Sequence, residues 1–204
     1  MIFKGARLDR LAGMTTREEE HTRADVLRNR AALLDAAADV LAADPEASLS
    51  EVATRAGLGR ATLYRHFESR DALRAAIRAE ALARASSALA GAGLPDCDTR
   101  EAIRRAAAVL VPLGVRFRIL LTEGSDTDPD FLAARNEALE PLWGVLARGV
   151  ENGELSRTAN IAWLGLVLAG MLMTAVRAAG VGLIDPAEAG DLVADAFFSG
   201  FGSS

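Results

Sequence analysis

Residues that carry chemistry or cross-links are scarce in this sequence. Cys97 is the only cysteine, which excludes an internal disulfide, and His21 and His66 are the only histidines. Aromatic residues make up 5% of the chain, and residues that favour strands never occur in alternating runs. No basic segment followed by a short apolar one opens the sequence, as it would in a secretory signal peptide, so we expect a cytoplasmic location.

The same scarcity argues against an enzyme. With two histidines, one cysteine and no glycine-rich loop between a strand and a helix, the sequence cannot assemble a catalytic triad, a metal site or a nucleotide site. We therefore expect no catalytic residue, no metal and no cofactor. A binding function remains.

Helix-forming residues dominate instead. Alanine, leucine and arginine are abundant and apolar residues recur with helical spacing, so the expected fold class is all-α with about nine helices. Residues 1–24 lack this periodicity and are expected to form a flexible arm. The expected helices cover 25–43, a short segment after Ser48, 60–67, 69–90, 98–111, 113–122, 129–151, 157–179 and 186–201.

The formal net charge of -5 conceals an asymmetry along the chain. Residues 1–90 carry 14 lysines and arginines against 13 aspartates and glutamates, whereas residues 91–204 carry 9 against 15. Binding to a polyanion depends on local charge rather than on the total, so the negative net charge does not exclude nucleic acid. The asymmetry predicts that only the N-terminal part contacts it.

Two short helices joined by a glycine are predicted around residue 57. Ser48 and Glu51 have the spacing of a capping box, in which each side chain accepts a hydrogen bond from the other residue's backbone N–H. Gly57 lies where the first helix needs a left-handed residue at its end, and the second helix covers 60–67. This arrangement is a helix-turn-helix. The inner face of its first helix is expected to hold Leu49, Val52, Ala53 and Ala56.

The second of these helices is predicted to expose a polar face. Leu63 and Phe67 are four residues apart and share the inner face, where they can contact Leu33, Val40 and Val52. The outward residues are Arg60, Thr62, Tyr64, Arg65 and His66. Guanidinium groups bind guanine or phosphate, a hydroxyl reaches a base edge and a phenol donates to phosphate, so this face suits a DNA groove.

The order of residues between 25 and 75 closely resembles the DNA-binding domain of TetR-family regulators. The resemblance rests on Ser48-Leu49-Ser50-Glu51-Val52-Ala53, Ala56-Gly57-Leu58, Thr62-Leu63-Tyr64-Arg65-His66-Phe67 and Ser69-Arg70-Asp71-Ala72-Leu73. It implies that Thr62 and its neighbours enter the major groove, that Tyr64 and His66 hold phosphates, and that Arg70 supplies the basic residue that starts the fourth helix. The expected DNA-binding set is Ser50, Gly59, Arg60, Ala61, Thr62, Tyr64, Arg65, His66 and Arg70.

Two positions depart from the family's pattern. Gly59 stands where a hydroxyl residue usually caps the recognition helix, and Ala61 stands where glycine is frequent. Glycine is still an acceptable cap, so the fold is retained, while the preferred DNA sequence stays open.

The resemblance further implies a homodimer on a pseudo-palindromic, double-stranded DNA operator, with no membrane involved. The arm is then either a solvated tail or a source of arginines for the DNA backbone.

Beyond residue 90 the resemblance rests on the number and size of the helices. It implies a C-terminal domain that dimerises and binds a small-molecule effector. Candidate pocket residues are Phe117, Leu120, Leu121, Trp143, Leu146, Met171 and Met173, with Arg116, Arg118 or Glu123 as polar anchors. For each of them a place in the core or on the surface is the alternative. The low charge of these helices favours a hydrophobic effector.

The run from Ile161 to Val176 is uncharged and lies between Arg157 and Arg177. It is too short for a membrane span, which needs roughly 20 apolar residues. A helix that is apolar on every face needs cover on every face, and dimerisation provides it. We expect this helix and the last one to form a four-helix bundle with their symmetry mates. The expected interface residues are Leu164, Leu168, Leu172, Leu192, Ala196 and Phe197.

The sequence thus predicts an arm (1–24), a helix-turn-helix DNA-binding domain (25–75) and a helical effector-binding and dimerisation domain (76–204). The expected function is that of a ligand-inducible repressor, which leaves its operator when a small hydrophobic molecule binds. An activator, a regulator without a ligand and a helical interaction protein of the same fold stay open as alternatives.

Overall fold

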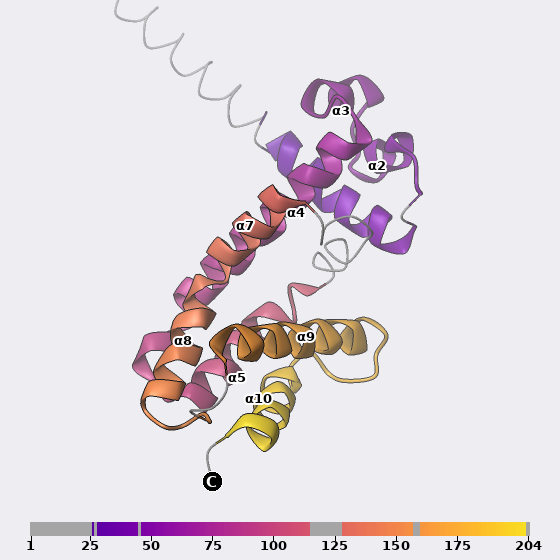
Figure 1. Cartoon of the computed structure of the whole chain (residues 1–204). Coiled ribbons are helices and arrows are strands. Elements are labelled where there is room, and N and C mark those ends of the chain that lie inside the picture. The colour runs from indigo at the N-terminus through magenta and orange to yellow at the C-terminus, as the bar shows by residue number, and fades with distance from the viewer. Residues whose placement is uncertain (1–25, 27, 45, 115–127, 157–159, 203–204) are drawn as a thin grey trace, which may run out of the picture.

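The computed structural model describes residues 26, 28–44, 46–114, 128–156 and 160–202. Within these residues every regular element is a helix, and an isolated antiparallel bridge joins Leu155 to Gly202, so the all-α prediction is confirmed (Figure 1). The elements are the N-terminal helix (28–43), α2 (Leu49–Arg55), α3 (Arg60–His66), α4 (Arg70–Gly91), the 3-10 helix η1 (Leu94–Asp96), α5 (Thr99–Leu110), α7 (Pro129–Ala138), α8 (Glu140–Glu151), α9 (Ile161–Gly180) and α10 (Ala189–Phe201).

The N-terminal helix, α2, α3 and the first turns of α4 share one small core (Figure 1). Leu33 comes from the N-terminal helix, Val52 from α2 and Leu63 from α3, and at most 1% of each residue is exposed. Helices of seven residues, such as α2 and α3, are unstable alone because nucleation is costly. The shared core therefore fixes the angle between them.

α4 belongs to two cores in turn. Its first turns contribute Leu73 and Ile77 to the N-terminal core, and its last turns contribute Ala85 and Leu89 to the C-terminal core. Between these ends α4 packs against Phe131 of α7, and Figure 1 shows α7 running alongside it. The domain boundary predicted after residue 75 thus falls inside one continuous helix.

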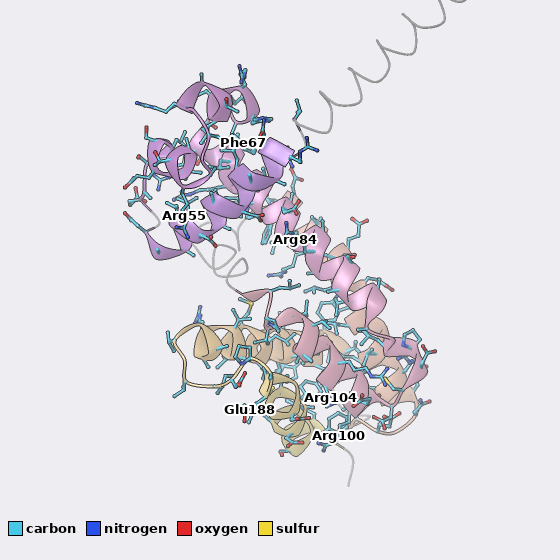
Figure 2. All side chains as sticks on the ribbon, turned by 180° about the vertical axis from the view of Figure 1, so that it is seen from behind. Arg55, Phe67, Arg84, Arg100, Arg104 and Glu188 are labelled. Atoms are coloured by element: carbon cyan, nitrogen blue, oxygen red, sulfur yellow. The ribbon has the colours of Figure 1, made fainter. Side chains whose placement is uncertain are left out.

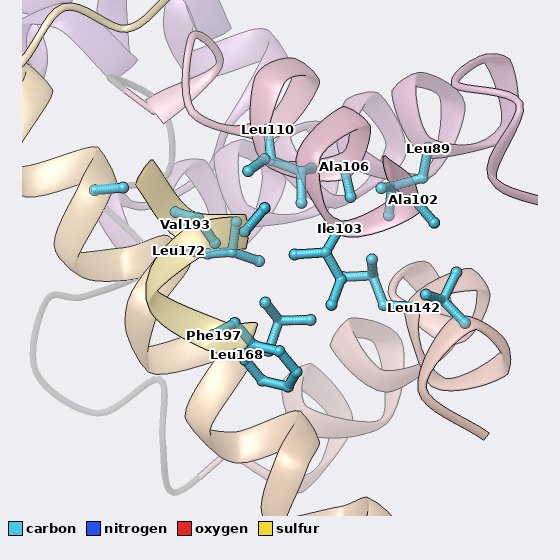
Figure 3. Packing of buried hydrophobic residues seen from close by; sticks show 14 of the residues in the cluster. Leu89, Ala102, Ile103, Ala106, Leu110, Leu142, Leu168, Leu172, Val193 and Phe197 are labelled. Atoms are coloured by element: carbon cyan, nitrogen blue, oxygen red, sulfur yellow. The ribbon is translucent and has the colours of Figure 1, made fainter. Parts of the chain in front are cut away.

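α5 lies at the centre of the C-terminal part, in contact with α4, α8 and α10. The approach of α10 is close, since a Cβ on Gly190 would lie 2.8 Å from the backbone oxygen of Arg104. Ile103 of α5 and Phe197 of α10 are fully buried, and Leu168 of α9 lies beside Phe197 (Figure 3). Burial of each such side chain is worth about 1.5–3 kcal/mol, which makes this cluster the main stabilising element of the C-terminal part.

Three predicted helices differ from the structure in their extent, and one of them, expected over 157–179, begins at Ile161 after its N-cap Asn160. The single helix expected over 129–151 is two helices, α7 and α8, which meet at Leu139. Pro141 explains the break, because it has no backbone N–H to donate to the Glu137 carbonyl one turn earlier, and that carbonyl accepts from Leu139 instead. The helix expected from 186 begins at Ala189, because the Asp185 side chain accepts the Ala187 N–H at 2.9 Å and holds a turn there. The arm and most of the helix expected over 113–122 lie outside the described residues.

α9 is longer than its apolar run suggested. It has 20 residues and a mean hydropathy of 1.8, so by length and composition it could cross a membrane, and the expectation that it is too short was wrong. A core helix of a protein passes the same test. Leu164, Leu168 and Leu172 of α9 are buried in the C-terminal core, whereas Trp163 and Leu166 are exposed. α9 therefore has one covered and one uncovered apolar face.

Candidate nucleic-acid interface

The capping box predicted for α2 is present. The Ser48 N–H donates to Glu51 Oε2 at 2.6 Å, and the Glu51 N–H donates to Ser48 Oγ at 3.3 Å. The hydrogen bond from the Ser48 backbone lowers the pKa of the Glu51 carboxyl below its ordinary value, with a further contribution from the Ser48 side chain. This reciprocal pair satisfies two backbone donors at the start of α2 and fixes where the helix begins.

The turn between α2 and α3 needs a glycine at one position only. Gly57 has φ +68°, in the left-handed region where a residue with a Cβ is strained. The N–H of the next residue, Leu58, donates to the Ala53 oxygen at 2.9 Å and closes the end of α2. Gly59, the N-cap of α3, has φ -71° and lies in open space. Its carbonyl accepts from Thr62 and Leu63, but no side chain caps α3. The turn lets α3 pack on the N-terminal core through Leu63 while its opposite face stays exposed.

The inner and outer faces of α3 are as predicted. Leu63 and Phe67 are 1% and 4% exposed, respectively, while Tyr64 is 49% exposed. Arg60, Ala61 and Arg65 are also exposed, and Thr62 and His66 are half-buried. A short helix anchored by two apolar side chains thus presents guanidinium, hydroxyl, phenol and imidazole groups outward. These are the groups that contact base edges and phosphates in a DNA groove.

Two contacts order the side chains on this face. The Arg65 guanidinium donates to the Thr62 hydroxyl at 3.0 Å, one turn back along α3. The His66 ring lies 6.2 Å from the Phe67 ring, centroid to centroid. Side chains that are held before binding lose less conformational entropy when they meet a partner.

Arg70 and Ser50, two further residues of the predicted DNA-binding set, make contacts within the protein. Arg70, at the start of α4, donates to the Glu46 backbone oxygen at 3.2 Å, and its Nη1 lies 3.7 Å from the Glu46 carboxylate. Arg74 reaches the same carboxylate at 3.8 Å. The Ser50 carbonyl accepts from the Thr54 hydroxyl at 2.9 Å. Arg70 therefore ties α4 to the segment before α2; its contact with DNA stays a prediction.

Arg30 is a candidate that the sequence did not single out. Its guanidinium carbon lies 5.8 Å from the centroid of the Phe67 ring, so a side chain of the N-terminal helix reaches the end of α3. Phe67 is labelled in Figure 2, within the N-terminal unit. Arg30 is exposed in an arginine-containing helix, and no local motif marks it; only the tertiary contact does.

The predicted effector-pocket residues divide into two groups. Phe117, Leu120 and Leu121, together with the anchors Arg116, Arg118 and Glu123, lie outside the described residues. Leu146 is fully buried in the C-terminal core, Trp143 and Met171 pack against that core, and Met173 is half-buried. Their role in binding an effector stays a prediction.

The residues predicted for the dimer interface also fall into two groups, one buried within the protomer and one exposed. Leu164, Leu168, Leu172 and Phe197 lie inside the protomer's own core and are at most 7% exposed, so they do not form its surface. Leu192 is 48% exposed and Ala196 is exposed. The largest apolar side chains that α9 leaves exposed are Ile161, Trp163 and Leu166, at 40%, 57% and 63% exposure. None of them was predicted from the sequence as an interface residue. The run from Ile161 to Val176 is apolar except for Thr174, so it gives little to mark its outer face.

Among the described residues, no group of three or more histidine, cysteine, aspartate or glutamate side chains is placed to hold a metal ion.

Comparisons with known proteins agree with this geometry. Residues 33–77 match the family model of the bacterial regulatory proteins of the tetR family. The HTH-type transcriptional repressor LfrR of Mycolicibacterium smegmatis is 50% identical over 52 residues, which are 25% of this chain and 28% of that repressor's length. The curated match thus spans under a third of the relative, and the fold comparison extends it.

Solved structures match most of the chain. LfrR from Mycobacterium smegmatis, a TetR-like transcriptional regulator in complex with proflavine, aligns with a TM-score of 0.74 and 27% identity over 85% of this chain and 96% of that one. PfmR from Thermus thermophilus, a TetR family transcriptional regulator, aligns with a TM-score of 0.65 and 25% identity over 81% of this chain and 91% of that one. The similarity therefore includes the C-terminal helices as well as the helix-turn-helix.

Proposed function

Because this chain belongs to the TetR family of bacterial regulatory proteins, we propose that it is a DNA-binding transcriptional repressor whose operator is released by a small-molecule effector. One observation carries the proposal. α3 is anchored by the buried Leu63 and Phe67 and presents Arg60, Tyr64 and Arg65 to solvent. Guanidinium and phenol groups gathered on the exposed face of a short helix that follows a glycine turn are suited to a DNA groove.

The recognition face is proposed to work by two kinds of contact. Thr62, in the first turn of α3, and Arg65, in its last turn, are hydrogen-bonded to each other and would meet base edges in the major groove. Tyr64 and His66, toward the end of the helix, would hold phosphates and so set the register on the duplex. The three small members of the predicted set, Ser50, Gly59 and Ala61, would allow the backbone to approach closely.

A homodimer is proposed to carry two such faces. α9 leaves Ile161, Trp163 and Leu166 uncovered, and Leu192 of α10 is half-exposed. Exposed apolar side chains on a long helix are typical of a surface that a second copy covers. Two recognition helices related by a two-fold axis then read a pseudo-palindromic operator, in which the half-sites lie about one helical turn, roughly 34–36 Å, apart.

Effector binding is proposed to act through α4. Arg78 of α4 lies 3.9 Å from the Asp128 carboxylate and 5.7 Å from the centroid of the Phe131 ring, both at the start of α7. A displacement of α7 would therefore move α4, whose first turns are part of the N-terminal core. LfrR was solved with proflavine. The low charge of the C-terminal helices leads us to propose a largely apolar effector for this chain. Coupling then requires that the effector favour one tilt of α4 over another.

The proposal includes a cytoplasmic location and no enzymatic activity. Operator DNA is in the cytoplasm of a bacterium, and the relatives are transcription regulators.

A gel-shift titration tests the proposal. Duplex DNA from beside the protein's own gene is titrated with the wild type, Tyr64→Ala and Arg65→Ala at two salt concentrations, with Arg177→Ala on α9 as a control that removes the same charge from the far end of the chain. Saturable, salt-sensitive binding that Tyr64→Ala and Arg65→Ala lose and Arg177→Ala keeps supports the proposed function. Binding that none of the variants alters, or no preference for this DNA at either salt, contradicts it and favours a helical interaction protein.

A second titration tests induction. The operator complex is challenged first with proflavine, the compound with which LfrR was solved, and separately with planar uncharged compounds. Release of the DNA supports an inducible repressor. Tighter binding would instead indicate a co-repressor.

A further inference from the structure

A hollow lies beside the recognition helix, where three elements meet. Its volume is about 490 Å³ and it is open to solvent. The last residues of α3, the first turns of α4 and the N-terminal helix line it, with Arg30, Tyr64, Arg65, His66, Phe67, Glu68, Ala72 and Ala76. Its rim thus continues the exposed face of α3 onto a helix outside the helix-turn-helix.

The charges around this hollow favour an anion. Arg30 and Arg65 are permanent cations, Tyr64 and His66 can donate hydrogen bonds, and Glu68 supplies the one carboxylate of the lining. Among the described residues, no ion pair involves Arg30 or Arg65. Their guanidinium groups are therefore not neutralised by the described part of the chain.

Arg30 is held in place without losing its donors. Its guanidinium lies over the buried Phe67 ring at 5.8 Å, and an aromatic face attracts the cation while leaving its N–H groups at the edge. Phe67 is also a core anchor of α3, so the position of Arg30 follows that of the recognition helix. A fixed, planar donor of this kind is suited to binding phosphate through two hydrogen bonds.

We propose that this hollow binds a phosphate of the DNA backbone and that Arg30, from the N-terminal helix, is its principal ligand. The phosphate lies beyond the bases read by α3, so Arg30 sets the register of the protomer on the duplex and contributes affinity without base preference. Glu68 weakens the site by repulsion. The inference rests on the proposed DNA binding, and it adds a contact outside the helix-turn-helix.

The test is the salt dependence of DNA binding, measured by fluorescence anisotropy on the duplex used above. The variants are Arg30→Ala, Arg30→Lys, Glu68→Gln and the control Arg177→Ala. Loss of one phosphate contact lowers the slope of log K against log[salt] by about 0.9, hence by about 1.8 for a dimer with two sites. We expect this loss for Arg30→Ala, partial recovery for Arg30→Lys, tighter binding for Glu68→Gln and no change for Arg177→Ala.

The ratio of affinities for the operator and for unrelated DNA gives a second readout. It stays constant in Arg30→Ala if the contact is to phosphate, and it falls if Arg30 reads a base instead. Thermal unfolding of each variant shows whether Phe67 and α3 keep their packing. A wild-type slope in a folded Arg30→Ala protein overturns the phosphate site and leaves the proposed function standing. Failure of the wild type to bind DNA overturns both.

Discussion

The indole ring of Trp143 on α8 lies directly against Gly165 of α9, so that a Cβ at residue 165 would overlap the ring. This contact sets the distance between α8 and α9, the helices on which the C-terminal core depends. Gly165→Ala is expected to destabilise the protein by about 1–3 kcal/mol through overpacking. Thermal or denaturant unfolding measures the change.

Gly144→Ala is the matched control, since a Cβ there would meet only the flexible end of Arg148, one turn along α8 and 3.9 Å away. There the gain in helix propensity, about 0.8–1 kcal/mol for glycine to alanine, should raise stability. Equal effects of the two substitutions would show that α8 and α9 do not meet through Trp143.

Gly57 and Gly59, in the turn of the helix-turn-helix, are a second pair of glycines, and their substitution is expected to change stability in opposite directions. Gly57→Ala places a side chain at φ +68° and should cost about 1–2 kcal/mol. Gly59→Ser places one at an N-cap with open space around it, where its hydroxyl can accept from α3, and should stabilise by a few tenths of a kcal/mol. Chemical denaturation separates these outcomes. If Gly57→Ala were neutral, the left-handed turn would not be required.

The acidic limit of stability is expected to involve Glu101 on α5. Arg104 donates to its carboxylate at 2.6 and 2.8 Å and Arg105 at 2.8 Å, and these hydrogen bonds, that of Arg104 foremost, lower the pKa of Glu101 from 4.5 to about 2. Arg104 and Arg100, on the same surface of α5, are labelled in Figure 2. A carboxyl with a lowered folded-state pKa stabilises the fold above its unfolded pKa and loses that contribution as the pH falls toward its folded value.

Glu101→Gln should therefore lower the melting temperature at pH 7, and its difference from the wild type should shrink between about pH 4.5 and pH 2. Glu137→Gln, at an exposed position of α7, is the control and should be nearly neutral. A difference from the wild type that is independent of pH would mean that the two arginines do not act through the ionised carboxylate.

Local chemistry made part of this structure predictable. The capping box of Ser48 and Glu51, the left-handed Gly57 and the spacing of Leu63 and Phe67 each depend on residues a few positions apart. The break at Leu139 was also signalled, by Pro141, although the residues on both sides of it favour a helix.

Tertiary placement was not predictable in the same way. Leu164 and Phe197 were assigned to the dimer interface, yet they lie in the protomer's own core. For Leu164 the reason is that α9 is apolar on nearly all sides, so its periodicity does not say which side faces α8 and α10. Arg30 was missed for a related reason: its partner Phe67 is distant in sequence, and only the fold brings the two together.

The exposed face of α9 gives the last prediction. Leu166 is 63% exposed in the protomer, so a charge there costs little in a monomer but would be buried and unpaired in the proposed dimer. Leu166→Glu should give folded monomers by sedimentation equilibrium and lose cooperative operator binding. Val181→Glu, at a 75% exposed position just past α9, should remain dimeric. If Leu166→Glu were as dimeric as the wild type, this face of α9 would not be the dimer interface. The two protomers would then have to associate through other residues.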